Sequence, residues 1–124
     1  MYNEKVMDHF QNPRNMREID QADGVGEVVS SHCGDMTRIY LQIEDDIIQD
    51  VSFKTFGCGA AIASASMATE LIKGKTLDEA LALTNMQVVD ALGGLPEAKI
   101  HCSVLAEESI RAAIEDYKQK RAPK

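Results

Sequence analysis

The change in hydrophobic periodicity near the middle of the chain is the feature that most restricts its fold. Before residue 57 apolar residues alternate with polar ones, as at Ile39, Leu41 and Ile43, which is the spacing of half-buried β-strands. After residue 59 apolar residues recur every three or four positions, which is the spacing of helices. Strands followed by helices predict an α+β fold, in which a three-stranded antiparallel sheet carries helices on one face.

The strands are expected at residues 27–31, 38–44 and 47–56, joined by connections too short for a parallel crossover. A short amphipathic helix is expected at residues 2–10, with Val6, Met7 and Phe10 facing inward. Asn85 is a candidate N-cap. Periodicity and capping patterns place the other helices at residues 60–73, 76–83, 85–92 and 103–120.

Length and charge limit the number of domains and the classes of partner. A chain of 124 residues fits a single domain, so residues 1–124 are expected to share one core. The net charge of −7 argues against a basic surface for nucleic acid or for an anionic membrane. The opening segment lacks a secretory signal pattern, and no apolar stretch approaches the ~18 residues of a membrane span. We therefore expect a cytoplasmic protein with no nucleic-acid or membrane partner.

Three cysteines stand beside turn-forming residues in segments that we expect to be loops. Cys33 precedes Gly34, Cys58 lies between two glycines, and Cys102 lies just before the last expected helix. An odd number of cysteines in a reducing compartment argues against a disulfide framework. Loops concentrate functional groups, whereas a free thiol taken alone is most often a small buried hydrophobe. Cys58 and Cys102 precede helices, whose positive ends favour the metal-binding thiolate.

An oxygen donor and a nitrogen donor accompany these thiols. Asp35 follows Cys33 by two positions, and His101 is adjacent to Cys102. Three thiols, one carboxylate and one imidazole can converge on a metal ion, but no pair of cysteines has the close spacing of a zinc ribbon. The fold must therefore bring these residues together. The residues alone leave open a metal site, separate buried thiols, and a Cys–His hydrolase or transferase that uses Cys102 with His101 or another histidine.

Four stretches of the chain together resemble the iron–sulfur cluster scaffold family of IscU and the N-terminal domain of NifU. They read "YNEKVMDHFQNPRN", "CGD", "FKTFGCGAAIASASMATE" and "KIHCSVLAEESIRAAIEDY". The resemblance implies a scaffold on which a [2Fe–2S] cluster is assembled from iron and sulfur and then transferred to apo-proteins. It also implies that the cluster ligands are Cys33, Cys58 and Cys102, with Asp35 or His101 completing the set.

The resemblance further implies a set of partners and a stoichiometric thiol reaction. A PLP-dependent cysteine desulfurase would deliver sulfur as persulfide, with Cys102 as the acceptor. An iron or electron donor and apo iron–sulfur proteins would complete the partners, so the protein is expected to be a carrier and not an enzyme. The cluster could sit in a monomer or between the subunits of a homodimer. Tyr2 matches a family position linked to self-association, although a disordered end explains it equally well.

Two departures from the family pattern limit what the resemblance carries. His32 stands where many members have a small residue, and it is either an additional ligand or a solvated loop histidine. Many members carry Leu-Pro-Pro-Val-Lys, a docking site for an Hsp70-type chaperone. Here Glu97 replaces the central proline, and we do not carry that partner over.

The alternative function is a zinc-binding structural or regulatory protein with the same ligands, because zinc accepts thiolate, imidazole and carboxylate.

Overall fold

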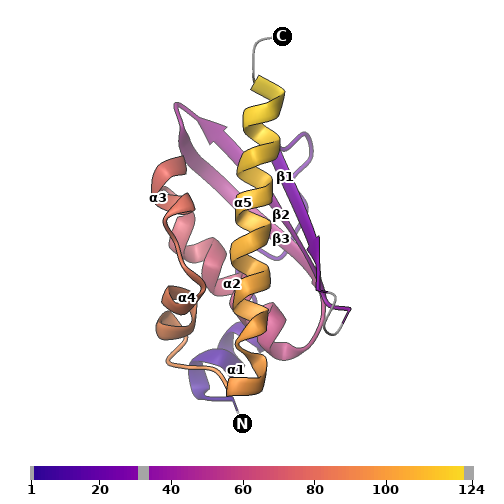
Figure 1. Ribbon diagram of the computed structural model, residues 1–124, viewed down its shortest axis with the longest axis vertical. Helices are drawn as coiled ribbons and strands as arrows, with labels where there is room; N and C mark the ends of the chain where they lie inside the picture. The colour runs from indigo at the N-terminus through magenta and orange to yellow at the C-terminus, as the bar shows by residue number, and fades with distance from the viewer. Residues whose placement is uncertain (1, 31–33, 122–124) are drawn as a thin grey trace.

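The computed structural model describes residues 2–30 and 34–121, and an antiparallel sheet forms one layer of it, behind α5 (His101–Arg121) in the view of Figure 1. The strands are β1 (Gly24–Val29), β2 (Met36–Glu44) and β3 (Ile47–Phe56), in the order β1-β2-β3. The expected three-stranded antiparallel sheet is confirmed. β1 begins earlier than the sequence pattern indicates, because Gly24 and Gly26 pair with β2 opposite Leu41 and Ile39.

Helices form most of the remaining described residues, and the two longest of them pack against the sheet. α5 contacts β1 and β2, α2 contacts β3, and the two helices contact each other. Figure 1 shows α5 crossing the sheet along most of the length of the molecule. The α+β architecture is therefore confirmed. The helices are α1 (Glu4–Gln11), α2 (Gly59–Ile72), α3 (Leu77–Leu81), α4 (Asn85–Ala91), the 3₁₀ turn η1 (Glu97–Lys99) and α5 (His101–Arg121).

The contact between α5 and β1 brings one backbone directly against the other. A Cβ atom placed on Gly26 would lie 2.2 Å from the Ala113 nitrogen, and one on Gly24 would lie 2.3 Å from the Ala113 oxygen. A larger residue at either position would push the helix away from the strand. The carboxylate of Asp116 also accepts a hydrogen bond from the Val25 N–H at 2.9 Å. These contacts fix α5 along β1.

This packing also determines where α5 begins. Gly24 lies against Tyr117 and Ala113, whereas Gly26 lies against Ala113 and Ser109, so α5 runs antiparallel to β1. The first turn of α5 is consequently at the Val29 end of β1 (Figure 1). Strand pairing places the start of β2 and the end of β3 at this same end of the sheet.

The small side chains of α2 allow it to be buried on nearly all sides. Alanine, serine and threonine make up most of this helix, and its apolar character is not confined to one stripe. Short side chains allow the neighbouring helices and β3 to approach its axis closely. The buried members are Ala60, Ala61, Ala63, Ser64, Ala65, Ser66, Ala68, Thr69 and Ile72.

The expectation for the inward face of α1 is wrong at one position. Val6 is fully buried as expected and Met7 is half-buried, but Phe10 is 39% exposed and His9 is only 4% exposed. His9 replaces Phe10 in the interior because its Nδ1 lies 2.7 Å from the Ser66 hydroxyl on α2. The buried imidazole therefore has the polar partner that burial requires.

Two helix starts also differ from the sequence expectation. The N-cap of α4 is Thr84, not Asn85, and Gln87 completes a capping box with it. α5 begins at His101, two residues earlier than expected, because η1 leads directly into it. Cys102 therefore lies in the first turn of a helix and not in the loop before it.

No helix in residues 2–30 and 34–121 has both the length and the apolar character needed to cross a membrane.

Burial and the positive charge of Arg14 lower the pKa of His9 below its ordinary value of 6.5. The folded protein thus prefers neutral His9, while the unfolded chain takes up a proton as the pH falls below about 6.5. We expect the free energy of unfolding to decrease from pH 7.5 to pH 5.5, and His9→Gln to weaken this dependence. Urea denaturation of both proteins measures it, and equal pH dependences would contradict the assignment.

Candidate metal centre

Three chain segments meet at the end of the sheet where α5 begins. Asp35 directly precedes β2, and Cys58 follows β3 by two residues. Met36 and Phe56 are paired across the two strands, so Asp35 and Cys58 emerge side by side. Cys102 in the first turn of α5 approaches from the helical layer. Residues that are distant in the sequence therefore become neighbours because of strand pairing and helix packing.

The side chains at this point form a compact donor group. The Sγ atoms of Cys58 and Cys102 are 3.7 Å apart, and Asp35 Oδ2 lies 4.0 Å from Cys58 Sγ. One donor atom from each of the three residues lies within 4.8 Å of the other two. Cys102 is 2% exposed, whereas Asp35 and Cys58 are half-buried. Two sulfurs and a carboxylate at this spacing can converge on a metal ion after small side-chain rotations.

Cys58 is the N-cap residue of α2, but its side chain makes no capping hydrogen bond. Its carbonyl oxygen instead accepts the Ala61 and Ile62 N–H groups at 3.0 and 3.2 Å. The backbone of Cys58 is thus held by the helix, while its thiol faces the other donors. Ser, Thr, Asp or Asn is usual at an N-cap, and Cys is a weak hydrogen-bond partner there. The Cys58 side chain therefore contributes little to the start of α2, and its thiol is left to the donor group.

Gly57 gives the Asp35 carboxyl group its space. A Cβ atom at position 57 would lie 2.9 Å from Asp35 Cγ and 2.9 Å from the Ala61 side chain. In the structure the carboxyl group of a candidate ligand occupies that space. The Asp35 backbone is held separately, because its carbonyl accepts the Ser30 N–H at 2.7 Å.

The other sequence-predicted site residues have different outcomes. His101 Nε2 lies 3.7 Å from Cys102 Sγ, although His101 is not part of the group of three within 4.8 Å. This distance is also longer than the ~3 Å that a Cys–His catalytic pair requires. Cys33, which we predicted as a ligand, and the neighbouring His32 lie outside the described residues. The structure thus gathers Asp35, Cys58 and Cys102, with His101 beside them.

Tyr2 and Lys99 border this centre. Tyr2 packs against the small buried group of Ala60 and Cys102, so it is not a disordered end. Burial raises the pKa of the Tyr2 phenol, and nearby Cys58 raises it further. Lys99 is in η1, and Cys58, followed by Tyr2, raises the pKa of its ammonium group. A positive charge therefore lies close to the thiols.

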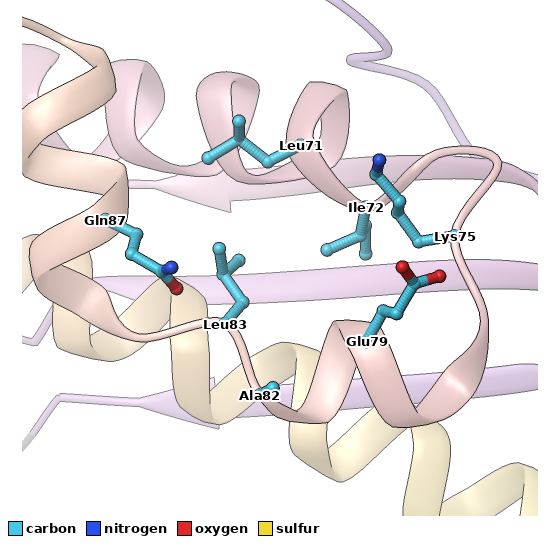
Figure 2. Close-up of a pocket in the computed structure, with 7 residues that line it drawn as sticks. All are labelled: Leu71, Ile72, Lys75, Glu79, Ala82, Leu83 and Gln87. Atoms are coloured by element: carbon cyan, nitrogen blue, oxygen red, sulfur yellow. The ribbon is translucent and has the colours of Figure 1, made fainter.

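The pocket drawn in Figure 2 lies elsewhere in the molecule. It has a volume of about 240 Å³ and apolar walls from Leu71, Ile72 and Leu83, with Lys75 and Glu79 at one side. Leu71 and Ile72 are at the C-terminal end of α2, whereas Cys58 caps its N-terminus. These ends of a 14-residue helix are about 20 Å apart. This pocket contains none of the candidate metal ligands.

The fold belongs to a known class of small α+β domains. It is similar to the N-terminal part of a nitrogen-fixing NifU-like protein from Brucella abortus, with a TM-score of 0.75, 20% identity, and coverage of 97% of this chain and 95% of that one. A putative iron–sulfur cluster assembly scaffold protein for the SUF system from Fervidobacterium islandicum gives a TM-score of 0.73 at 27% identity. This match covers 91% of this chain and 96% of that one.

The family is established by sequence as well. The NifU-like N terminal domain family matches residues 1–124, and the chain belongs to this family. An Archaeoglobus fulgidus protein named iron–sulfur cluster assembly scaffold protein IscU 1 is 57% identical over 97% of this chain and 78% of its own length. The Escherichia coli K12 protein named iron–sulfur cluster assembly scaffold protein IscU is 51% identical over 99% of this chain and 98% of its own length.

The Gly57→Ala variant tests whether Gly57 positions Asp35. The added Cβ should displace the Asp35 carboxyl group and weaken zinc binding by about tenfold, as expected when a residue that orients a ligand is lost. Competition with a chromophoric chelator measures the affinity. Gly59→Ala is the matched control, because the nearest atoms to its Cβ would be side-chain atoms of Phe10 and Tyr2 at 3.2–3.4 Å and not those of a candidate ligand. Gly57→Ala is also made in the Asp35→Ala variant. If it lowers the zinc affinity there by the same factor as in the wild type, Gly57 does not act through Asp35.

Proposed function

We propose that this protein is a scaffold on which an iron–sulfur cluster is assembled and from which it passes to apo-proteins. The observation that carries the proposal is the meeting of Asp35, Cys58 and Cys102, with their donor atoms within 4.8 Å of one another. Family membership supports it, because relatives at 51–57% identity are named as assembly scaffolds. The protein acts as a carrier and not as an enzyme.

The donor chemistry suits temporary binding. Clusters in electron-transfer proteins are usually held by four thiolates. A carboxylate or an imidazole is a harder and weaker partner for a cluster iron than a thiolate. We therefore propose a [2Fe–2S] cargo bound by Cys33, Cys58 and Cys102, with Asp35 or His101 as the ligand that exchanges. The distance between Asp35 Oδ2 and Cys58 Sγ supports Asp35 in this role.

Sulfur delivery requires a thiol that accepts persulfide sulfur. We propose that a PLP-dependent cysteine desulfurase supplies this sulfur to Cys102, and that an iron or electron donor completes the assembly. His101 Nε2 lies 3.7 Å from Cys102 Sγ, and Lys99 adds a positive charge nearby. A positive charge beside a thiol is a setting in which reactive cysteines are found. Because Cys102 is only 2% exposed, its neighbours must move for the delivery step.

Anaerobic reconstitution tests the scaffold function directly. The protein is incubated with ferrous iron, cysteine and a cysteine desulfurase, and visible absorption is recorded. We expect the sulfur-to-iron charge-transfer bands of a [2Fe–2S] cluster in the absorption spectrum. Mössbauer spectra should identify the same cluster, which contains two irons. Protein that binds zinc tightly but never gains this absorption would instead support the zinc-binding alternative, since zinc has no such bands.

The Asp35→Ala variant tests the exchanging ligand. Removing the weak carboxylate should slow transfer of the assembled cluster to an apo-ferredoxin by about tenfold, because the point at which an incoming ligand enters is lost. Circular dichroism in the visible range follows the transfer. His101→Ala is the comparison. If His101→Ala slows transfer and Asp35→Ala does not, the exchanging ligand is the imidazole.

A further inference from the structure

The two described cysteines are close enough to react with each other once either carries a sulfane sulfur. Their Sγ atoms are 3.7 Å apart, which is van der Waals contact, and a disulfide requires about 2.05 Å. We propose that Cys58 and Cys102 form a resolving pair that converts a persulfide on either thiol into free sulfide. This inference rests on the proposed function, and it identifies the group that first reduces the delivered sulfur.

The reaction is a thiol–disulfide exchange within one chain. With the persulfide on Cys102, the thiolate of Cys58 attacks the inner sulfur, Cys102 Sγ, and the bond from that sulfur to the terminal sulfur breaks. The terminal sulfur leaves with the bonding electron pair as hydrosulfide. The thiol proton of Cys58 goes to solvent or to the leaving sulfur. Sulfane sulfur is thereby reduced to sulfide, while the two cysteines are oxidised to a Cys58–Cys102 disulfide. The same equation holds if Cys58 carries the persulfide.

The positions of the two thiols favour this internal route. Cys102 is 2% exposed, so an external thiol reaches its inner sulfur only when neighbouring groups move, whereas Cys58 Sγ is already 3.7 Å from it. The Cys58 thiol makes no capping hydrogen bond, and its half-buried side chain is not held by the helix that it precedes. Two groups held in contact by the fold react as if at a very high local concentration. An external dithiol must then return two electrons to the disulfide before the pair can act again.

The experiment uses metal-free protein under anaerobic conditions with cysteine persulfide as the sulfane donor. The protein is exposed briefly, desalted, and followed by intact mass and by sulfide release. In the wild type we expect a transient gain of one sulfur atom, then loss of that atom with sulfide release, ending two hydrogen atoms below the starting mass. Peptide mapping should join Cys58 to Cys102. The Cys58→Ser variant should keep the added sulfur and release sulfide at least about tenfold more slowly.

The outcomes separate this inference from the function on which it rests. Wild-type protein that gains sulfur and retains it as stably as Cys58→Ser would overturn the resolving pair and leave the persulfide acceptor intact. A mapped disulfide that joins Cys33 to either other cysteine would also overturn it. Protein in which neither Cys58 nor Cys102 gains sulfur would overturn both the acceptor and the pair. Mapping in the wild type keeps the test decisive even if the Cys58→Ser variant is unstable.

Discussion

The backbone contact between α5 and β1 is the constraint on which the rest of the structure depends. Without side chains at Gly24 and Gly26, the helix lies directly on the strand, and its direction is fixed by successive contacts from Tyr117 back to Ser109. Because α5 begins at His101, this direction carries Cys102 to the end of the sheet where β3 passes into α2. The small residues of α2 then allow the two helix starts to approach until the thiols touch.

The site combines a rigid frame with a side that faces solvent. The backbones of Asp35, Cys58 and Cys102 are tied to a strand or to a helix, while Asp35 and Cys58 retain part of their exposure. Lys99 is the positive group beside the thiols in a protein whose net charge is −7. This arrangement suits a cargo that carries negative charge on its sulfurs and must leave again. A closed structural zinc site would instead have its four ligands shielded from exchange.

The sequence predicted the fold well because the signals were local. Alternation located β2, and capping patterns located the helices, as the Thr76–Glu79 capping box at the start of α3 illustrates. The errors arose where tertiary contacts decide. His9 displaced Phe10 from the interior because Ser66 on α2 offers it a partner, and β1 was extended by pairing through two glycines. No local pattern reports either contact.

The candidate site was predictable in its residues but not in its geometry. Turn residues and helix starts indicated the thiols, and the family resemblance implied their roles. That Asp35 occupies the space above Gly57, and that Tyr2 packs beside Cys102, follow only from the assembled structure.

X-ray absorption at the zinc edge of the zinc-loaded protein tests the central claim, that the sulfurs and the carboxylate serve one metal. We expect two or three sulfur neighbours at about 2.3 Å with an oxygen or nitrogen neighbour at about 2.0 Å, and loss of a sulfur in Cys58→Ser. A shell of oxygen and nitrogen alone, unchanged in that variant, would contradict it.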